Sequence, residues 1–153
     1  MKKFIFKRVQ LVPITLEEAW QFFSDPRNLS KITPASLDFQ IETDVPKHIE
    51  NDLTIEYTVK PLLNIPVKWV SRIKDVYKPY RFADEQIKGP YAYWHHEHLL
   101  SECHGGTRVE DIVTYALPFG LIGEMIHPYV VLPKLNEIFE YRRETLEVFF
   151  GKL

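Results

Sequence analysis

The chain has 153 residues, of which 45% are hydrophobic and 26% are charged, and its formal net charge is −2. This balance is typical of a globular protein and excludes an intrinsically disordered chain. The Lys and Arg residues form no concentrated cluster, which argues against a nucleic-acid partner, because phosphate binding needs a basic face.

Targeting and membrane signals are the next property that the sequence addresses. The first eight residues are basic but lack the apolar run of a signal peptide, and no apolar stretch reaches the about 18 residues that a transmembrane helix needs. The single cysteine, Cys103, cannot form an intrachain disulfide, which favours a reducing compartment. We therefore expect a cytoplasmic protein in which residues 1–153 form one domain.

The N-terminal part of the chain predicts a strand followed by two short helices. Residues 3–12 alternate in polarity, which indicates a strand. Thr15 and Glu18 have the spacing of a capping box and predict the start of a first helix. A second short helix is expected over residues 25–32, because Asp-Pro is a typical helix start. Two aromatic side chains of the first helix are expected to pack against the sheet edge rather than a ligand: Trp20 and Phe23.

From Leu37 to Leu117 the hydrophobic period changes to two, which is the period of β-strands. Proline, glycine and asparagine residues interrupt this pattern at regular intervals and indicate turns. The pattern predicts six strands, over residues 37–44, 53–60, 66–77, 80–88, 91–102 and 107–117.

The last part of the chain predicts an apolar connector and a long helix. Residues 121–132 are apolar and are interrupted by Pro128. We interpret this segment as a connector that covers the mouth of a pocket, with a membrane-touching lid as the alternative. Pro133 suits the first turn of a final helix that runs to about Phe150, and Gly151 ends it.

These elements predict an α+β fold. Consecutive antiparallel strands followed by one long helix are typical of a layered structure in which the helix covers one face of the sheet. Seven twisted strands curl, so we expect a curved sheet wrapped around the C-terminal helix, with two short helices after the first strand. Such a sheet and helix can enclose a volume that side chains do not fill.

The hairpin formed by the last two predicted strands is the most informative segment. A two-residue turn at His104 and Gly105 fixes its register. Residues directly opposite one another share a face of the sheet. The predicted opposite pairs are Trp94 with Tyr115, His96 with Val113, His98 with Asp111, and Leu100 with Val109.

Apolar residues make this face of the hairpin the one to bury, yet it also carries two histidines and an aspartate. Burying such groups without partners costs about 2–7 kcal/mol each. We therefore predict a cross-strand pair between His98 and Asp111, in which the aspartate raises the pKa of the histidine. These two residues are the candidate acid–base catalysts.

Neighbouring strands continue the same mixture of aromatic and polar residues, which is typical of a small-molecule pocket. The predicted ligand-binding residues are Tyr57, Trp69, Ser71, Phe82, Asp84, Gln86, Trp94, His96, His98, Asp111, Val113 and Tyr115.

Several interpretations of His96, His98 and Asp111 stay open from the sequence. They can form a polar network that only satisfies its own buried groups, or they can orient a ligand or act in catalysis. Two histidines and a carboxylate are also the ligand set of some metal sites. We nevertheless expect neither a metal nor a cofactor, since the sequence contains no phosphate-binding glycine loop and no dinucleotide motif.

Several motifs, taken in order, resemble the SRPBCC (START-like, helix-grip, Bet v 1-like) superfamily over nearly the whole chain. The similarity is greatest to bacterial ligand-binding domains described as polyketide-cyclase-like or cell-division-inhibitor-like. The motifs are Asp25-Pro26-Arg27-Asn28-Leu29 with Ile32-Thr33-Pro34, Trp69-x-Ser71-x-Ile73, Phe82-x-Asp84-x-Gln86 with Gly89-Pro90-Tyr91, Trp94-x-His96-x-His98, and Asp111-x-Val113-x-Tyr115-x-Leu117-Pro118. The resemblance implies a helix-grip fold with a hydrophobic cavity, and it implies no particular reaction.

Three functions follow as hypotheses. The first is carriage or sensing of a hydrophobic small molecule without catalysis. The second is a cyclase, dehydratase or hydrolase that acts on such a molecule through the His98–Asp111 pair. The third is a regulatory module that interacts with another protein.

Overall fold

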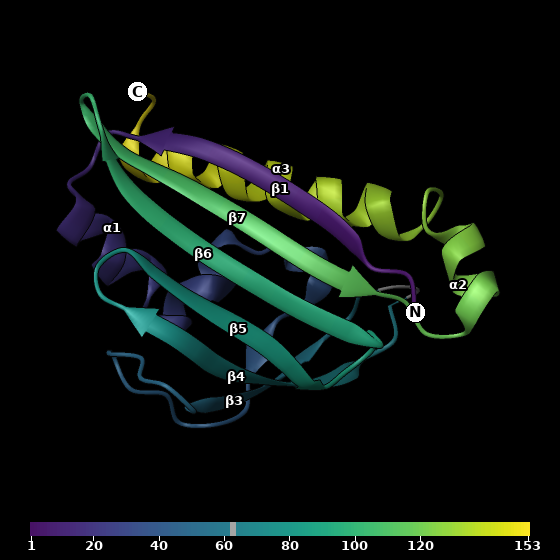
Figure 1. Cartoon of the computed structure of the whole chain (residues 1–153). Helices are drawn as coiled ribbons and strands as arrows, with labels where there is room; N and C mark the ends of the chain where they lie inside the picture. Colours follow the sequence, from purple (N-terminus) through teal and green to yellow (C-terminus); the bar gives the residue numbers. More distant parts are fainter. Residues whose placement is uncertain (62–63) are drawn as a thin grey trace.

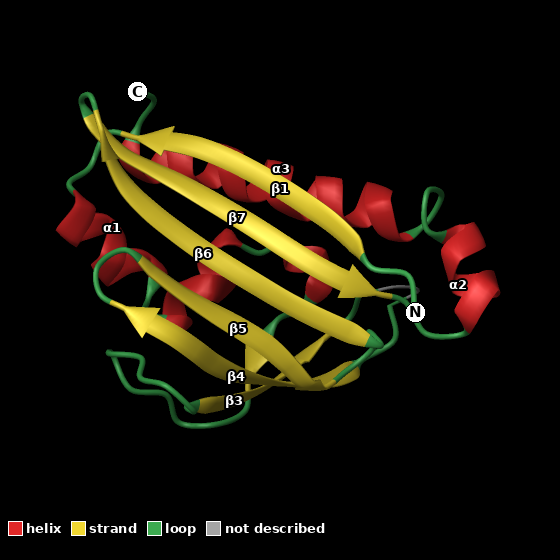
Figure 2. Cartoon of the chain, viewed as in Figure 1, coloured by secondary structure: helices red, strands yellow, loops and turns green. Residues whose placement is uncertain are grey.

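The computed structural model describes residues 1–61 and 64–153. It contains a curved, seven-stranded antiparallel sheet whose concave face is covered by a long C-terminal helix and by short helices near the N-terminus (Figures 1 and 2). The predicted α+β class and the helix-grip arrangement are therefore confirmed.

The elements follow one another in an order close to the predicted one. The strands are β1 (Phe4–Val12), β2 (Gln40–Ile41), β3 (Thr54–Val59), β4 (Val67–Tyr77), β5 (Arg81–Lys88), β6 (Tyr93–Cys103) and β7 (Gly106–Ala116). The helices are α1 (Leu16–Phe23), the 3₁₀ helices η1 (Pro26–Ile32) and η2 (Ala35–Leu37), then α2 (Gly120–Ile126) and α3 (Val131–Phe150). The strand order across the sheet is β1-β7-β6-β5-β4-β3-β2.

The register of the β6–β7 hairpin is the predicted one. Trp94 lies opposite Tyr115, and His98 lies opposite Asp111. At the turn, Cys103 pairs with Gly106, and Gly105 has a φ of 83°, in the left-handed region that glycine adopts without strain. The turn chemistry therefore fixed which residues face inward along both strands.

The helices after β1 begin where their caps predict. The Thr15 hydroxyl accepts a hydrogen bond from the Glu18 backbone N–H (3.1 Å), which satisfies one free donor of α1. The Asp25 side chain does the same for η1 by accepting from the Arg27 N–H (3.1 Å).

The strand predicted over residues 37–44 is much shorter in the structure. Only Gln40 and Ile41 pair with β3. Leu37 instead ends η2, and the backbone N–H of Asp38, whose φ is 47°, closes that turn by donating to the Ala35 carbonyl. A residue in the left-handed region cannot continue an extended strand, so this part of the prediction was wrong.

The apolar segment between the sheet and the last helix is not a simple connector. Residues Gly120–Ile126 form α2, and α3 begins at Val131, two residues before the predicted Pro133. Gly151 ends α3 as predicted. Helix α2 projects at one end of the molecule, near the N-terminus, while the C-terminus lies at the opposite end (Figure 1).

The core has two parts, both on the concave side of the sheet. Under α3, buried residues of β1, β7 and α3 pack together: Phe6, Val113, Tyr115, Leu117, Val131, Leu135 and Phe139. Under α1, a second cluster contains Val12, Leu16, Ala19, Trp20, Phe82, Leu100 and Val109. Trp20 packs against the sheet on its central strand β5 rather than at the expected edge, with its ring 5.8 Å from that of Phe82.

Within residues 1–61 and 64–153, no helix is both long enough and apolar enough to span a bilayer.

Candidate functional site

A cavity of about 400 Å³ lies between the sheet, α3 and the short helices. Helix α3 packs directly on β1 and β7, so the space left open lies beside it, under the middle strands. Its walls are mostly apolar and largely aromatic: Phe22, Phe23, Leu37, Phe39, Ile55, Tyr57, Trp69, Phe82, Trp94, Leu135, Ile138 and Phe139. Known small-molecule pockets have volumes of about 300–1,000 Å³, so this cavity has the size of a binding site.

Eight of the twelve predicted ligand-binding residues line this cavity. They are Tyr57, Trp69, Ser71, Phe82, Asp84, Trp94, His96 and His98. The predicted alternation on β3 to β6 therefore brought these side chains to one space.

The other four predicted residues, Gln86, Asp111, Val113 and Tyr115, are not among the residues that line the cavity. The Gln86 amide holds the β5–β6 turn by donating to the Tyr91 carbonyl (2.8 Å) and accepting from its N–H (3.0 Å). Val113 and Tyr115 lie under α3 in the core. Because α3 covers β7, inward-facing residues of that strand contact the helix instead of the open space.

A buried polar network occupies the part of the site nearest α3. The His96 Nε2 atom lies 2.8 Å from Asp111 Oδ1, and the Arg142 Nη1 atom lies 3.3 Å from the same oxygen. The His98 Nε2 atom lies 2.6 Å from Asp84 Oδ2. A carboxylate accepts hydrogen bonds, which places a proton on the Nε2 atom of each imidazole.

The predicted pairing of His98 with Asp111 was wrong in its partner. The two residues are opposite in register, but His98 Nδ1 is 3.7 Å from Asp111 Oδ1, too far for a hydrogen bond. His96 is instead hydrogen-bonded to Asp111, which lies opposite His98 in the sheet. His98 is hydrogen-bonded to Asp84, which lies opposite His96.

The histidine rings are fixed by stacking as well as by hydrogen bonds. The His98 ring lies between the ring of Phe82, at 4.2 Å, and the ring of His96, at 3.8 Å. This stack of three rings limits the rotation of both imidazoles, so the His98 edge keeps one orientation relative to the cavity.

Burial and neighbouring charges set the protonation states of the network. Burial lowers the pKa of His98, and the charge of His96 lowers it further, which outweighs the opposing effect of Asp84. Burial alone raises the pKa of Asp84, but the hydrogen bond from His98 and the charges of His96, His98 and Arg142 bring it below its ordinary value. The pair is therefore a neutral imidazole bonded to a carboxylate at neutral pH, which differs from the predicted raised pKa of His98.

The pKa of Asp111 is also lowered. Burial alone raises this pKa, and the hydrogen bond from His96 together with the charge of Arg142 outweighs it. Arg142 is itself buried, and its guanidinium lies over the Phe139 ring, 4.7 Å from the centroid. This end of the site thus holds two carboxylates, those of Asp84 and Asp111, and one guanidinium, which is already paired with Asp111.

Two further groups can form hydrogen bonds inside the cavity. The Tyr57 hydroxyl lies 3.1 Å from the Ser71 hydroxyl on the neighbouring strand, and burial together with the charge of Asp84 raises the pKa of Tyr57. The indole N–H of Trp69 is buried and has no hydrogen-bond partner among the described residues. The wall of the cavity thus combines aromatic surface with a few uncharged polar groups.

A metal is a poor fit to this site. Among residues 1–61 and 64–153, Asp84, His96 and His98 offer ligand atoms within 4.8 Å of one another, whereas the sequence had suggested Asp111 as the carboxylate. An imidazole binds a metal in the plane of its ring. The two rings are stacked and only 24° from parallel, so their lone pairs do not converge on one point.

Sequence reasoning missed Arg142 and the contribution of the short helices. The helical spacing of Leu135, Phe139, Arg142 and Leu146 places the arginine on the buried stripe of α3, and this was the available signal. Phe23, which we expected to pack only against the sheet edge, lines the cavity because α1 and η1 turn back over the open strands.

Comparisons with solved structures agree with this geometry. The chain is similar to protein Ms6760 from Mycobacterium smegmatis, with 15% identity, a TM-score of 0.66, and coverage of 95% of this chain and 92% of that one. It is similar to protein CV1439 from Chromobacterium violaceum, with 11% identity, a TM-score of 0.73, and coverage of 98% and 99%. For Ara h 8.0201, a Bet v 1-like protein, the identity is 13%, the TM-score 0.60, and the coverage 95% and 98%.

The chain has a Bet v 1-like, helix-grip fold. No protein-family model matches the sequence, and no curated protein matches it. At these identities the likeness establishes the fold alone, so the function has to be argued from the cavity itself.

Proposed function

We propose that this protein binds a neutral, ring-containing hydrophobic molecule in the cavity between the sheet and α3. The observation that carries the proposal is an apolar cavity of about 400 Å³ with the His98–Asp84 pair in its wall. A cavity of this volume that only completed a core would lower stability, since empty volume costs about 24 cal/mol per Å³ in mutated cores.

The aromatic wall supports a ring-containing ligand. The rings of Tyr57 and Trp69 are stacked at 5.8 Å and 16°, and the Trp94 ring meets Trp69 edge-on at 5.2 Å. Together with Phe82 these rings offer both faces and edges, which flat ring systems contact well.

The charge of the polar network supports a neutral ligand. Its two carboxylates oppose a buried carboxylate or phosphate, since the guanidinium of Arg142 is already paired with Asp111. Hydroxyl or amide groups of a ligand would meet polar side chains in the cavity wall, among them His98, Ser71 and Tyr57. Such groups would orient the molecule, while the apolar walls would supply most of the affinity.

Binding is tested with N-phenyl-1-naphthylamine, a neutral aromatic probe whose fluorescence rises in apolar surroundings. We expect saturable binding that Ile138→Trp reduces at least about tenfold, because the indole fills space in the cavity. Val148→Trp is the matched control, since Val148 lies on the same helix and is 83% exposed. If the probe does not bind, or if both variants bind it equally, the proposal is wrong.

A second candidate function is acid–base catalysis on such a ligand, and the His98–Asp84 pair favours it. A neutral imidazole that is oriented by a carboxylate and faces a cavity has the arrangement of a general base. The pair could remove a proton from carbon beside a ring ketone and return it, with no net change in the ketone.

Proton exchange provides the test for catalysis. In deuterated water, we expect the protein to accelerate deuterium incorporation next to the carbonyl of 2-tetralone, as measured by NMR. His98→Gln should abolish the acceleration while the naphthylamine probe still binds. Exchange at the buffer rate, or equal exchange in the variant, would leave ligand binding without catalysis.

A further inference from the structure

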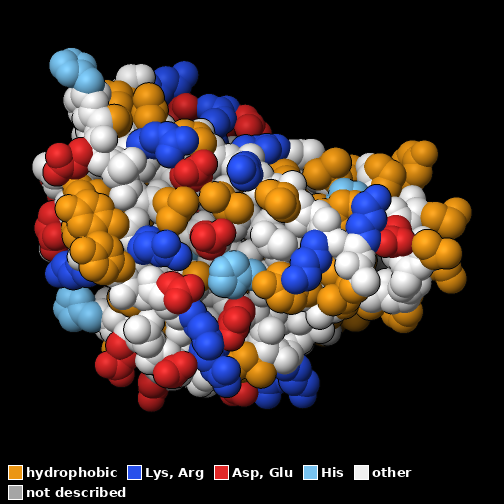
Figure 3. All heavy atoms as spheres, viewed as in Figure 1, with side chains coloured by type: hydrophobic (Ala, Val, Ile, Leu, Met, Phe, Trp, Pro, Cys, Tyr) orange, Lys and Arg blue, Asp and Glu red, His pale blue; other side chains and the backbone are white. Residues whose placement is uncertain are grey.

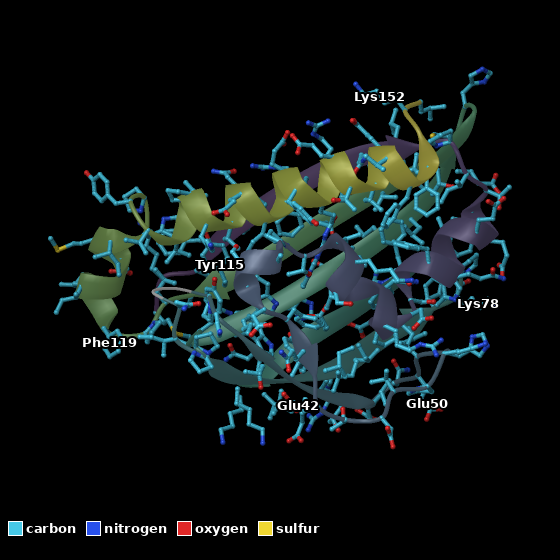
Figure 4. All side chains as sticks on the ribbon, turned by 180° about the vertical axis from the view of Figure 1, so that it is seen from behind. Glu42, Glu50, Lys78, Tyr115, Phe119 and Lys152 are labelled. Carbon is cyan, nitrogen blue, oxygen red and sulfur yellow. The ribbon has the colours of Figure 1, made fainter. Side chains whose placement is uncertain are left out.

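The segment around α2 exposes an unusual group of large hydrophobic side chains. We call this group the α2 tip: Phe119, Leu121, Ile122, Met125, Ile126 and Tyr129. Phe119 is 80% exposed and Tyr129 is 82% exposed, and they lie within one short stretch of chain. Figure 3 shows hydrophobic side chains gathered at the end of the molecule where α2 projects, and Figure 4 shows Phe119 at the start of α2. Contiguous exposed apolar surface of this kind marks an interaction site.

The fold holds the tip outward. Phe119 and Gly120 both have positive φ values, 69° and 55°, which turn the chain out of β7 into α2. Gly123 then packs against the Pro118 carbonyl so closely that a Cβ atom would lie 2.2 Å from that oxygen. The outward position of the tip is therefore built into the backbone and does not result from a loose loop.

The same segment forms part of the cavity wall. Leu117, Pro118, Phe119, Gly123 and Ile126 all line the cavity. Phe119 and Ile126 belong both to this wall and to the α2 tip, so the tip borders the cavity. Residues 121–132, interpreted from the sequence as a cover for the pocket mouth with a membrane-touching lid as the alternative, contain most of α2.

Basic residues lie beside the tip. The Phe4 ring stacks on the His127 ring at 3.7 Å, which holds the N-terminal segment against the end of α2. That segment carries Lys2 and Lys3, and the Lys3 Nζ atom lies over the Tyr93 ring at 4.1 Å. Glu124 is the single acidic residue between positions 117 and 132 of the sequence. An apolar tip with lysines beside it complements an anionic lipid surface.

The size and shape of the tip favour a bilayer over a second protein. A standard protein interface involves about 20–30 residues on each side and needs a matching surface. The tip offers six side chains on one projecting helix and its flanks, which suits insertion among lipid headgroups.

We propose that the α2 tip docks on an anionic lipid bilayer, which brings the cavity mouth to the membrane surface. The docking itself requires nothing in the cavity. Its use, direct exchange of a hydrophobic molecule between membrane and cavity, rests on the proposed ligand-binding function.

Co-sedimentation with vesicles tests the docking. We expect the protein to bind vesicles of phosphatidylcholine mixed with phosphatidylglycerol, and to bind pure phosphatidylcholine more weakly. Leu121→Glu combined with Met125→Glu should reduce binding at least about tenfold, because both side chains lose their contact with acyl chains. Leu121→Ser with Met125→Ser, which adds no charge, should reduce it in the same direction.

The matched control places the same charges on distant exposed residues. Val148→Glu combined with Ile87→Glu should leave vesicle binding close to that of the original chain, because neither residue belongs to the tip. Lys2→Glu with Lys3→Glu should remove the preference for phosphatidylglycerol.

Three results would overturn the proposal: no binding to either vesicle, equal loss in the tip and control variants, or a dimer in solution that the tip variants dissociate. Binding of the naphthylamine probe without vesicles reports the cavity separately. A protein that binds the probe and ignores vesicles would keep the proposed function and lose the docking.

Discussion

Arg142 is the residue whose replacement tests the polar network most directly. It is the cation paired with Asp111 in a part of the protein that also buries Asp84. At the observed separation of 3.3 Å and an effective dielectric constant of about 20, the attraction between the two charges is about 5 kcal/mol. Part of this is offset by the cost of burying the guanidinium, and breaking buried pairs typically costs about 3–5 kcal/mol.

We therefore expect Arg142→Met to lower the free energy of unfolding by about 3–5 kcal/mol, because Asp111 then remains buried without its cation. Methionine preserves much of the apolar contact with Phe139, so the loss of stability reports the removal of the guanidinium charge. Urea denaturation at neutral pH measures the change. The double variant Arg142→Met with Asp111→Asn should recover most of the lost stability, since both charges of the pair are then absent.

The pH dependence provides a second test of the same reasoning. The folded-state pKa of Asp111 is lowered, so its contribution to stability is present above the unfolded value of about 3.9 and is lost as pH falls through the folded pKa. In Arg142→Met the folded pKa rises, so acid destabilisation should begin at a higher pH. A loss below about 0.5 kcal/mol with an unchanged acid limb would show that the pair behaves like a surface ion pair and would refute the argument.

Three further predictions concern other parts of the site. Because the pKa of His98 is lowered in the folded state, the unfolded chain binds more protons than the folded chain below about pH 6.5. The free energy of unfolding should therefore fall as the pH decreases from about 6.5 toward the folded pKa. Urea titrations at several pH values should show that His98→Gln flattens this slope. Gly123→Ala should lower the thermal midpoint by several degrees, as seen by circular dichroism, because its Cβ would clash with the Pro118 carbonyl; an unchanged midpoint would mean that α2 can shift freely. Tyr115→Phe should cost about 1–3 kcal/mol, since the Tyr115 hydroxyl lies 2.5 Å from His127 Nε2 and both groups are buried; the same unfolding measurement would contradict this if the cost were negligible.

The sequence was sufficient for the parts of the fold that depend on local patterns. The turn at His104 and Gly105 fixed the register of the β6–β7 hairpin, and the period of two along β3 to β6 turned the cavity residues inward. Caps at Thr15 and Gly151 placed a helix start and a helix end. These features follow from a few neighbouring residues, so no knowledge of distant contacts was needed.

Tertiary structure decided which partner each polar group takes. From the hairpin alone, His98 is expected to pair with Asp111. A third strand, β5, instead places Asp84 Oδ2 2.6 Å from His98 Nε2, and Asp111 is bonded to His96 and Arg142. Hydrogen bonds follow side-chain directions, which depend on the twist between strands and on the stacking of the rings. Register alone does not contain that information.

The position of α3 decided which inward-facing residues form core and which line the cavity. Val113 and Trp94 lie on the same concave face, yet the helix covers Val113 and leaves Trp94 beside open space. The sequence determined by itself that this face is inward and aromatic. Only the packing of α3, which comes from the far end of the chain, determined where the volume remains empty. Long-range contacts set the position of this helix, and the alternating pattern of the strands is the same under the helix and beside it.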